Sequence, residues 1–182
     1  MHSQERVWRE QGLRCAVLAG DEQAWRTWYD EAYAELYRYV LWRCGGLRDR
    51  TDEVVQDAWL TAVRRVRTFD PEAGPFSAWL RGIAANLLRN AFRRQRRRGR
   101  TEVLGPEIAR TDGTLEQRLR AESVARALGD LPARYEAVLR AKYLEGQSVA
   151  AIAAASGDTP KAVESLLSRA RQAFRDAYLQ RE

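Results

Sequence analysis

Apolar residues recur every three or four positions along almost the whole chain, and this spacing is the strongest constraint on its fold. Asp21 is expected to cap a helix whose apolar face begins at Trp25 and Trp28, and Gly45-Gly46 are expected to end it. No alternating pattern typical of a strand continues for more than a few residues. The sequence therefore predicts an all-α protein.

Two further helices are predicted in the first half of the chain. One begins near Thr51 or Asp52, and the other begins at Ser77 and extends to about Arg98. Residues 69–76 between them contain two prolines and a glycine, which predict a loop. The side chains expected on the buried faces of the first two helices include Tyr29, Tyr33, Leu36, Tyr37, Val40, Val55, Trp59, Ala62, Val63 and Val66.

Composition indicates two separately packed cores. All six tryptophans lie in the first 79 residues, whereas the second half is rich in alanine. Residues 99–114 contain three glycines and a proline without sustained periodicity, which predict a flexible linker. We therefore expect an N-terminal helical domain over residues 1–98 and a C-terminal domain over residues 115–182.

The C-terminal domain has the layout of a helix-turn-helix unit. Helices are predicted over residues 115–128, from Pro132, from Ser148 to Ala155, and from Thr159-Pro160 to about Tyr178. The second of these is expected to bury Tyr135, Val138, Leu139 and Tyr143.

The charge balance points to a polyanionic partner. The chain has 31 Lys and Arg against 25 Asp and Glu, a net charge of +6. Nucleic acid is the first candidate and a membrane surface the second, and composition alone leaves both open.

One predicted helix face matches nucleic acid in its chemistry. Eight arginines and no acidic residue occur between Ala73 and Thr101. On the helix from Ser77, one face opposite the apolar side carries Asn86, Arg89, Asn90, Arg93 and Arg97. Arginines neutralise phosphates, and asparagine amides both donate to and accept from base edges. The alternatives are a solvated basic helix end and a membrane-surface patch.

Two other features of the first half leave alternatives open. Phe69 and Phe76 either stack on unpaired bases or anchor their loop in the core, and their spacing alone favours the core. An acidic-polar face of the second helix is either solvated or a docking site for a basic protein; it carries Asp52, Glu53, Gln56 and Asp57.

The last predicted helix has a polar face suited to duplex DNA. Its inward positions are Val163, Leu167, Ala170 and Phe174. Its outward positions are Lys161, Glu164, Ser165, Ser168 and Gln172, with Arg169 and Arg171 beside them. The short serines permit close approach to DNA, and the alternative is a set of solubilising side chains.

Sites of other kinds are not indicated. Cys15, Cys44 and the lone His2 offer no disulfide framework, no metal-ligand spacing and no nucleophile–base pair. No phosphate-binding glycine loop occurs, so we predict no catalytic residues, no metal and no cofactor. No secretory signal or membrane-spanning run is apparent, so we expect a cytoplasmic protein without membrane insertion.

Four stretches, in order, closely resemble the extracytoplasmic-function sigma factors of the sigma-70 family. They are Asp49 to Trp59, Phe76 to Asn86 with the following arginine run, Leu131 to Gly146, and Ala162 to Arg171. The resemblance extends from about Asp21 to Tyr178. It implies a specificity subunit of bacterial RNA polymerase, without chemistry of its own, that binds core polymerase and promoter DNA. An anti-sigma protein is a further partner that the family implies.

The resemblance also implies roles for individual residues. The first stretch resembles the helix that docks on the polymerase clamp, which implies core contacts by Asp52, Gln56 and Asp57. The second resembles the promoter-melting segment that holds unpaired minus-ten bases. This implies minus-ten contacts by Phe69, Asn86, Arg89, Asn90, Arg93 and Arg97. The family often has an acidic residue where Asn90 stands.

The last two stretches resemble the family's reader of the minus-thirty-five element. The implied contacts are Lys161, Glu164, Ser165, Ser168 and Arg169. Basic residues commonly stand where this chain has Glu164 and Leu166, so we expect less positive charge on this face, with Glu164 accepting from a cytosine amine.

Two other functions remain open at this point. One is a stand-alone helix-turn-helix regulator that binds duplex DNA without polymerase, and the other is an arginine-rich RNA-binding protein. The acidic docking helix and the loop before Phe76 favour a sigma factor.

Overall fold

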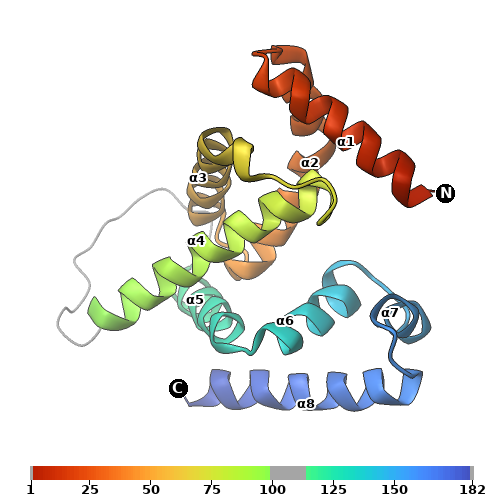
Figure 1. The fold of residues 1–182 in the computed structure, drawn as a ribbon. Coiled ribbons are helices and arrows are strands. Elements are labelled where there is room, and N and C mark those ends of the chain that lie inside the picture. The colour runs from red at the N-terminus through yellow and green to blue at the C-terminus, as the bar shows by residue number, and fades with distance from the viewer. Residues whose placement is uncertain (1, 99–113, 181–182) are drawn as a thin grey trace. The chain divides into compact units, whose positions relative to one another are not determined.

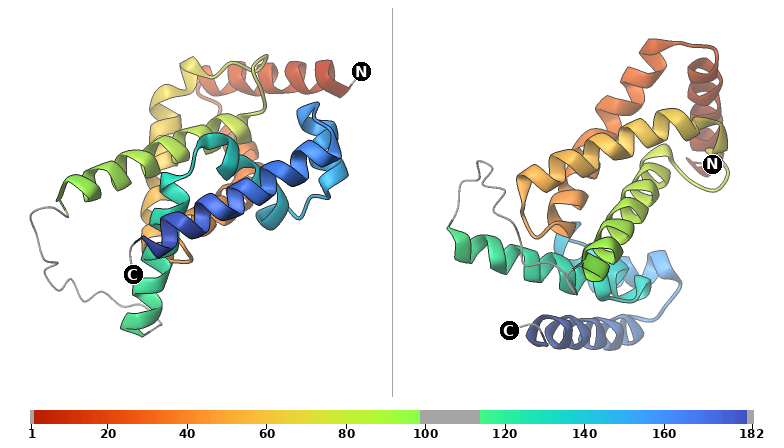
Figure 2. Two further views of the ribbon diagram at one scale, coloured as in Figure 1. Left: turned by 90° about the horizontal axis from the view of Figure 1, so that it is seen from below. Right: turned by 90° about the vertical axis from the view of Figure 1, so that its left-hand side faces the viewer.

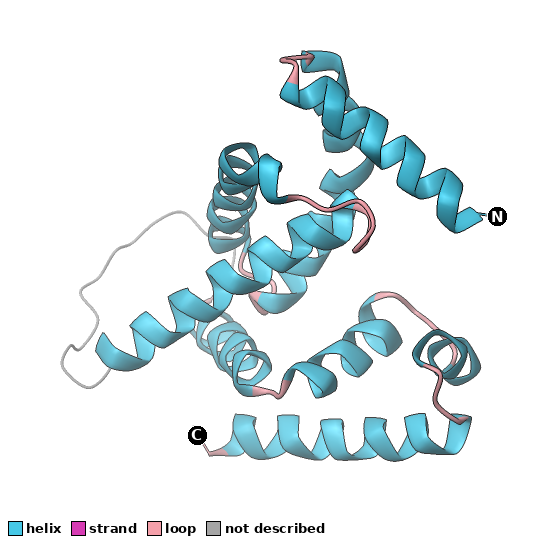
Figure 3. Cartoon of the chain, viewed as in Figure 1, coloured by secondary structure: helices cyan, strands magenta, loops and turns pink. Residues whose placement is uncertain are grey.

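The computed structural model describes residues 2–98 and 114–180, and every regular element in these residues is helical (Figure 3). This confirms the predicted all-α class. In chain order the elements are α1 (His2–Leu18), α2 (Glu22–Arg43), α3 (Arg48–Arg65), the 3-10 helix η1 (Val66–Thr68), α4 (Phe76–Arg98), α5 (Leu115–Asp130), α6 (Ala133–Leu139), the π-helix η2 (Arg140–Leu144), α7 (Val149–Ser156) and α8 (Pro160–Leu179) (Figure 1).

The chain forms two compact units. One comprises residues 1–41 and 48–108, and the other comprises residues 42–47 and 109–182. The predicted linker, residues 99–114, lies outside the described residues except for Thr114. Within the described ranges, no helix is both long enough and apolar enough to cross a bilayer.

The first unit is built around aromatic rings. Trp28 of α2 and Phe76 of α4 are each 1% exposed, and their rings stack with centroids 4.1 Å apart. Phe69, Trp59 and Trp79 surround Phe76 at centroid distances of 5.6, 5.9 and 5.6 Å. Aromatic side chains bury large apolar areas, so this cluster supplies much of the stability of the unit.

Helices α3 and α4 lie side by side in this unit (Figures 1 and 2). Their small and branched residues allow close approach, because Ala58, Ala62 and Ala84 are all 0% exposed. Leu80 and Leu88, two turns apart on α4, are also 0% exposed. The face of α4 opposite this stripe is therefore left for other contacts.

The predicted boundaries of α2 are confirmed. The carboxylate of Asp21 accepts hydrogen bonds from the backbone N–H groups of Gln23 and Ala24, at 2.8 and 3.4 Å. Gly45 and Gly46 follow the helix with φ of 65° and 90°, a conformation that glycine adopts without strain. In contrast, α3 begins at Arg48, a turn earlier than predicted.

The second unit has the predicted helix-turn-helix layout. The hydroxyls of Thr114, Ser148 and Thr159 cap α5, α7 and α8 by accepting from backbone N–H groups. Gly157 ends α7 in the left-handed region, with φ of 71°. The core of α6, α7 and α8 contains Val138, Leu139, Ile152, Ala153, Val163, Leu166, Leu167 and Ala170.

Four predicted core residues are exposed. Tyr29, Tyr33, Val63 and Tyr143 have exposed fractions of 44%, 36%, 53% and 59%. For Tyr143 the cause is η2, where Glu145 donates its N–H to the carbonyl of Arg140, five residues earlier. This wider turn removes the alignment that a four-residue step has on an α-helix, so Tyr143 does not follow Leu139 into the core.

Candidate functional site

The basic face predicted on α4 is exposed. Asn86, Arg89, Asn90 and Arg93 all lie on the side opposite the buried stripe. Arg89 donates a hydrogen bond from its guanidinium to the amide oxygen of Asn86, which joins two of these side chains on the surface. The arrangement presents amide groups between guanidinium groups, a combination that suits bases flanked by phosphates.

Not every arginine of α4 belongs to this face. The guanidinium of Arg81 forms an ion pair with the carboxylate of Glu35 on α2, so its charge is already neutralised. The side chain of Arg97, which the sequence placed on the same face, lies outside the described residues. Among the described side chains, the basic face therefore consists of Asn86, Arg89, Asn90 and Arg93.

Phe69 does not join this face. Its ring is 2% exposed and packs against Trp28, Phe76 and Trp79, with centroids 5.6, 5.6 and 5.4 Å away. In this conformation the ring has no free surface for a base, so the minus-ten contact that the resemblance implied would require Phe69 to leave the core. Phe69 and Phe76 anchor the loop in the core, the alternative that spacing alone favoured.

The acidic face of α3 is exposed along its length. Asp52, Glu53, Gln56 and Asp57 all lie at the surface, whereas Val55 and Ala58 are buried on the other side. Burial, followed by a hydrogen bond to Asp52 and the charge of that carboxylate, raises the pKa of the Tyr37 phenol above 10.0. The phenol therefore stays protonated at neutral pH and continues to donate to Asp52.

A row of tyrosines on α2 borders this acidic face, and sequence reasoning missed its exposure. The rings of Tyr29 and Tyr33 lie 5.0 Å apart, and those of Tyr33 and Tyr37 lie 5.9 Å apart. Tyr29 also lies 4.9 Å from Trp59 of α3. The four-residue spacing was visible in the sequence, but it was interpreted as a buried stripe. Tyrosine is one of the residues enriched in protein–protein interfaces relative to the rest of the surface.

The outward face of α8 is as predicted. Lys161, Glu164, Ser165, Ser168 and Arg169 are exposed. On the opposite side, Val163 and Ala170 are 1% and 0% exposed.

Leu166 departs from the predicted recognition face. It is 7% exposed and belongs to the core of α6, α7 and α8. The absence of a basic residue there therefore removes no charge from the surface, which corrects the expectation for this position.

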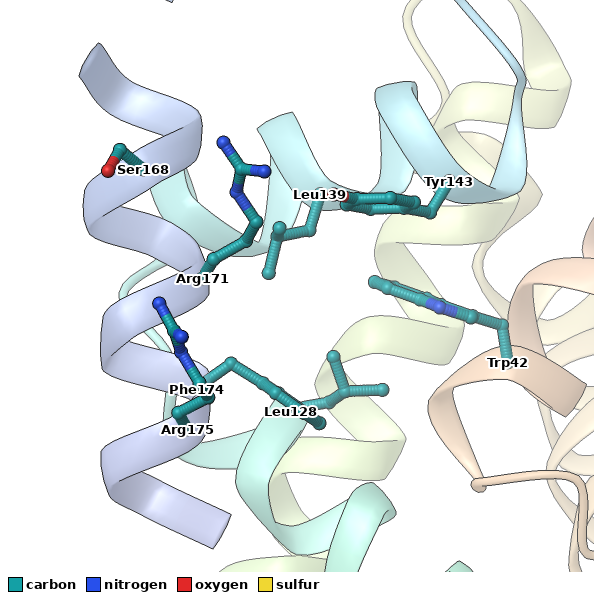
Figure 4. A pocket seen from close by; sticks show the side chains of 8 residues that line it. All are labelled: Trp42, Leu128, Leu139, Tyr143, Ser168, Arg171, Phe174 and Arg175. Carbon is teal, nitrogen blue, oxygen red and sulfur yellow. The ribbon is translucent and has the colours of Figure 1, made fainter. Parts of the chain in front are cut away.

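Figure 4 shows Ser168, Arg171 and Arg175 on α8, where Phe174 lines a pocket with Leu128 and Leu139.

Within the described ranges, no group of three or more His, Cys, Asp or Glu residues is arranged to hold a metal ion. Cys15 is exposed and Cys44 is buried, and neither cysteine is part of a disulfide.

Comparison with known proteins gives two family matches in order along the chain. Residues 28–98 match Sigma-70 region 2, and residues 121–174 match Sigma-70 region 4. The first contains α3 and α4, and the second contains α6, α7 and most of α8.

Several curated relatives are sigma factors. SigL of Mycobacterium tuberculosis is 32% identical over 162 residues, which cover 87% of this chain and 91% of SigL. BldN of Streptomyces coelicolor is 31% identical over 84% of this chain, which spans 59% of the length of BldN. CnrH of Cupriavidus metallidurans is 34% identical over 66% of this chain and 69% of CnrH.

Solved structures give similar matches. CnrH in complex with the cytosolic domain of CnrY is 26% identical, with a TM-score of 0.48 over 95% of this chain and 98% of that one. BldN in the RsbN–BldN complex is 23% identical, with a TM-score of 0.39 over 90% of this chain and 97% of that one. Because both sigma-70 regions match in order and SigL matches over nearly its full length, this chain belongs to the extracytoplasmic-function sigma factors, the alternative sigma factors that direct RNA polymerase to promoters.

Proposed function

We propose that the exposed face of α4 holds unpaired bases of the minus-ten element. The observation that carries this proposal is that Asn86, Arg89, Asn90 and Arg93 share one exposed face of a helix that contains no acidic residue. The asparagine amides match the Watson–Crick edges of unstacked bases, and the arginines match the flanking phosphates. Arg97 joins the set by its spacing along the helix.

The acidic face of α3 is the proposed docking site for core polymerase. Asp52, Gln56 and Asp57 supply charge and hydrogen-bonding groups for a basic partner surface. The neighbouring Tyr29 and Tyr33 add exposed rings, which are common where binding energy is concentrated in protein interfaces.

The outward face of α8 is the proposed reader of the minus-thirty-five duplex. Lys161, Ser165, Ser168 and Arg169 are all exposed, which supports this proposal. In it, Lys161 and Arg169 contact phosphates, while the short serines allow the helix to approach the floor of the major groove. Glu164 accepts from a cytosine amine in this proposal.

Membership of the family also supports proposals for the location, the chemistry and the regulation of this chain. The chain acts as a cytoplasmic specificity subunit whose bond-making chemistry is done by core polymerase. An anti-sigma protein is its proposed regulator, because the related CnrH and BldN have been solved with CnrY and RsbN.

Run-off transcription with purified core polymerase and a genomic promoter library tests the proposal as a whole. Core polymerase with this chain is expected to initiate at a defined subset of promoters that core polymerase alone does not use. Single-base changes in those promoters then identify the minus-ten and minus-thirty-five positions. Tight binding to duplex DNA without polymerase, and no gain in initiation, would instead indicate a stand-alone regulator.

A further inference from the structure

Helix α1 lies before the segment that matches Sigma-70 region 2, and it carries none of the residues proposed to contact polymerase or DNA. One of its faces carries Arg6, Glu10 and Arg14, which follow one another at four-residue spacing and so lie on the same side of the helix. All three side chains bond to residues of the connection between α3 and α4 or to the first residue of α4. In Figures 1 and 2 this connection (yellow) passes alongside α1 (red).

The two arginines hold the backbone of this connection. The guanidinium of Arg6 donates to the carbonyl oxygen of Pro71 at 3.1 Å. The guanidinium of Arg14 donates to the carbonyl oxygen of Arg67 at 3.0 Å. Because both acceptors are backbone groups, these bonds fix the path of the chain rather than the rotamer of a side chain.

Glu10 holds the start of α4. It is 5% exposed, and its two carboxylate oxygens accept from the backbone N–H of Phe76 at 3.2 Å and from the indole N–H of Trp28 at 2.8 Å. The first N–H groups of a helix lack partners within the helix, and the positive end of the helix dipole favours an anion. Glu10 therefore caps α4 from another helix.

The distance along α4 makes this anchoring consequential. Asn86 lies ten residues after Phe76, which corresponds to about 15 Å along a helix. A tilt of about 5° at the start of α4 would move Asn86 by about 1 Å, which is enough to spoil hydrogen bonds that lose strength steeply with geometry.

We infer that Arg6, Glu10 and Arg14 of α1 are positioning residues for minus-ten recognition. They hold the α3–α4 connection and the first residue of α4, so that the basic face of α4 meets the unpaired strand at a fixed angle. This inference rests on the proposed role of α4. It adds that base selectivity at the minus-ten element depends on α1, a helix outside the residues that match Sigma-70 region 2.

The test uses holoenzyme assembled from core polymerase and full-length chain. Its probe is a single-stranded oligonucleotide that carries the non-template minus-ten sequence, with either the preferred base or a substituted one. The double variant Arg6→Ala/Arg14→Ala should reduce discrimination between the two probes by about fivefold, the effect of a weakened hydrogen bond. Circular dichroism and core affinity should not change.

Two further variants separate positioning from general stability. Arg9→Ala removes an arginine of the same helix that pairs with Glu31 of α2, and it should leave discrimination unchanged. Arg6→Lys/Arg14→Lys keeps a donor at each position and should restore most of the discrimination. A purely structural role would lower core affinity and helicity together with discrimination, and Lys would not selectively rescue base choice.

The outcomes are distinct for the two proposals. If Asn86→Ala loses discrimination but the folded Arg6→Ala/Arg14→Ala protein does not, the positioning role is overturned and the role of α4 stands. If neither variant loses discrimination between the two probes, the proposed role of α4 is wrong, and the positioning role that rests on it is wrong as well. Should the double variant not fold, Arg6→Ala carries the same readout, because it removes a single, partly buried hydrogen bond.

Discussion

At the scale of single residues, Asn86 gives the sharpest test of the α4 face. Asn86→Ala removes an exposed amide and little packing, so folding and core binding should be unchanged. We expect selectivity at one minus-ten position to be relaxed by about 1–3 kcal/mol. Permanganate footprinting should show weaker opening on duplex promoters, and a pre-melted bubble should rescue it only in part, because the lost contact is to the single strand.

The matched control for this prediction is Gln11→Ala, which removes an exposed amide from α1. It should melt promoters normally. If the Asn86→Ala protein also melts promoters normally and keeps its base preference, Asn86 is an ordinary surface residue and the base-holding role of α4 is wrong.

Burial was the property of single residues that the sequence predicted least well. The resemblance placed Phe69 at the bases and Leu166 at the DNA surface, yet they are 2% and 7% exposed. A family alignment gives the position of a residue along a helix or loop, whereas burial depends on which neighbouring elements pack over it. Residue type and spacing alone favoured the core position of Phe69, because phenylalanine is among the residues most often buried.

At the scale of elements, the acidic face of α3 should act on polymerase and not on DNA. Asp57→Lys is expected to weaken association with core polymerase by at least about fivefold, since a charge reversal at an interface adds repulsion. Asp57 is preferable to Asp52, which receives the hydrogen bond of Tyr37. Titration of labelled core polymerase measures the change, and it should be larger at low salt.

Glu22→Lys is the control for this reversal, because it changes the net charge equally at an exposed position at the start of α2. It should leave core affinity within about twofold, as expected for a charge outside the interface. Equal effects of the two reversals, or no effect of Asp57→Lys with normal circular dichroism, would make the acidic face plain solvated surface.

The arginines of α4 should act mainly through phosphates. Arg93→Ala is expected to weaken binding to all promoter sequences alike and to flatten the salt dependence by about 0.7–0.9 log units of slope. Arg81→Ala on the same helix should leave the slope unchanged, because Glu35 already neutralises that charge. A sequence-selective loss at unchanged slope for Arg93→Ala would contradict the assignment.

The ends of elements were predictable where one residue determines them. Asp21, Ser148 and Thr159 cap helices as their side chains predict, and Gly157 ends α7. The π-turn η2 was not predictable, because an extra residue in a turn leaves the composition of the helix unchanged. The wrong prediction for Tyr143 followed directly from it.

At the scale of the whole molecule, the effects of the two proposed DNA-reading faces, on α4 and α8, should be separable. Lys161→Ala/Arg169→Ala on α8 is expected to reduce duplex binding upstream while preserving selectivity for the single-stranded minus-ten probe. Asn86→Ala should do the reverse, and the two losses should add in free energy, because sites without shared partners usually behave independently. Promoters with and without a minus-thirty-five element, transcribed side by side, measure both losses.

Arg175→Ala is the control on α8, since it removes an exposed arginine that is not part of the proposed reading face. Strong coupling between the α8 and α4 variants would contradict independent reading. Composition predicted a division near residues 99–114, because tryptophan is confined to the first half of the chain and alanine is abundant in the second. The two compact units of the structure divide the chain differently, since residues 42–47 belong to the second unit.

The buried carboxylate of Glu10 also shows that the segment matching the sigma family is shorter than the segment that packs as one folded unit. The matched sigma region starts at Trp28, but the acceptor for the indole N–H of Trp28 is contributed by a helix that ends ten residues earlier. A fragment cut at the family boundary would expose the aromatic core on one side and leave two buried donors without acceptors. The packing of Trp28 and of the first residue of α4 therefore depends on a side chain of α1, although α1 lies outside the segment that matches Sigma-70 region 2.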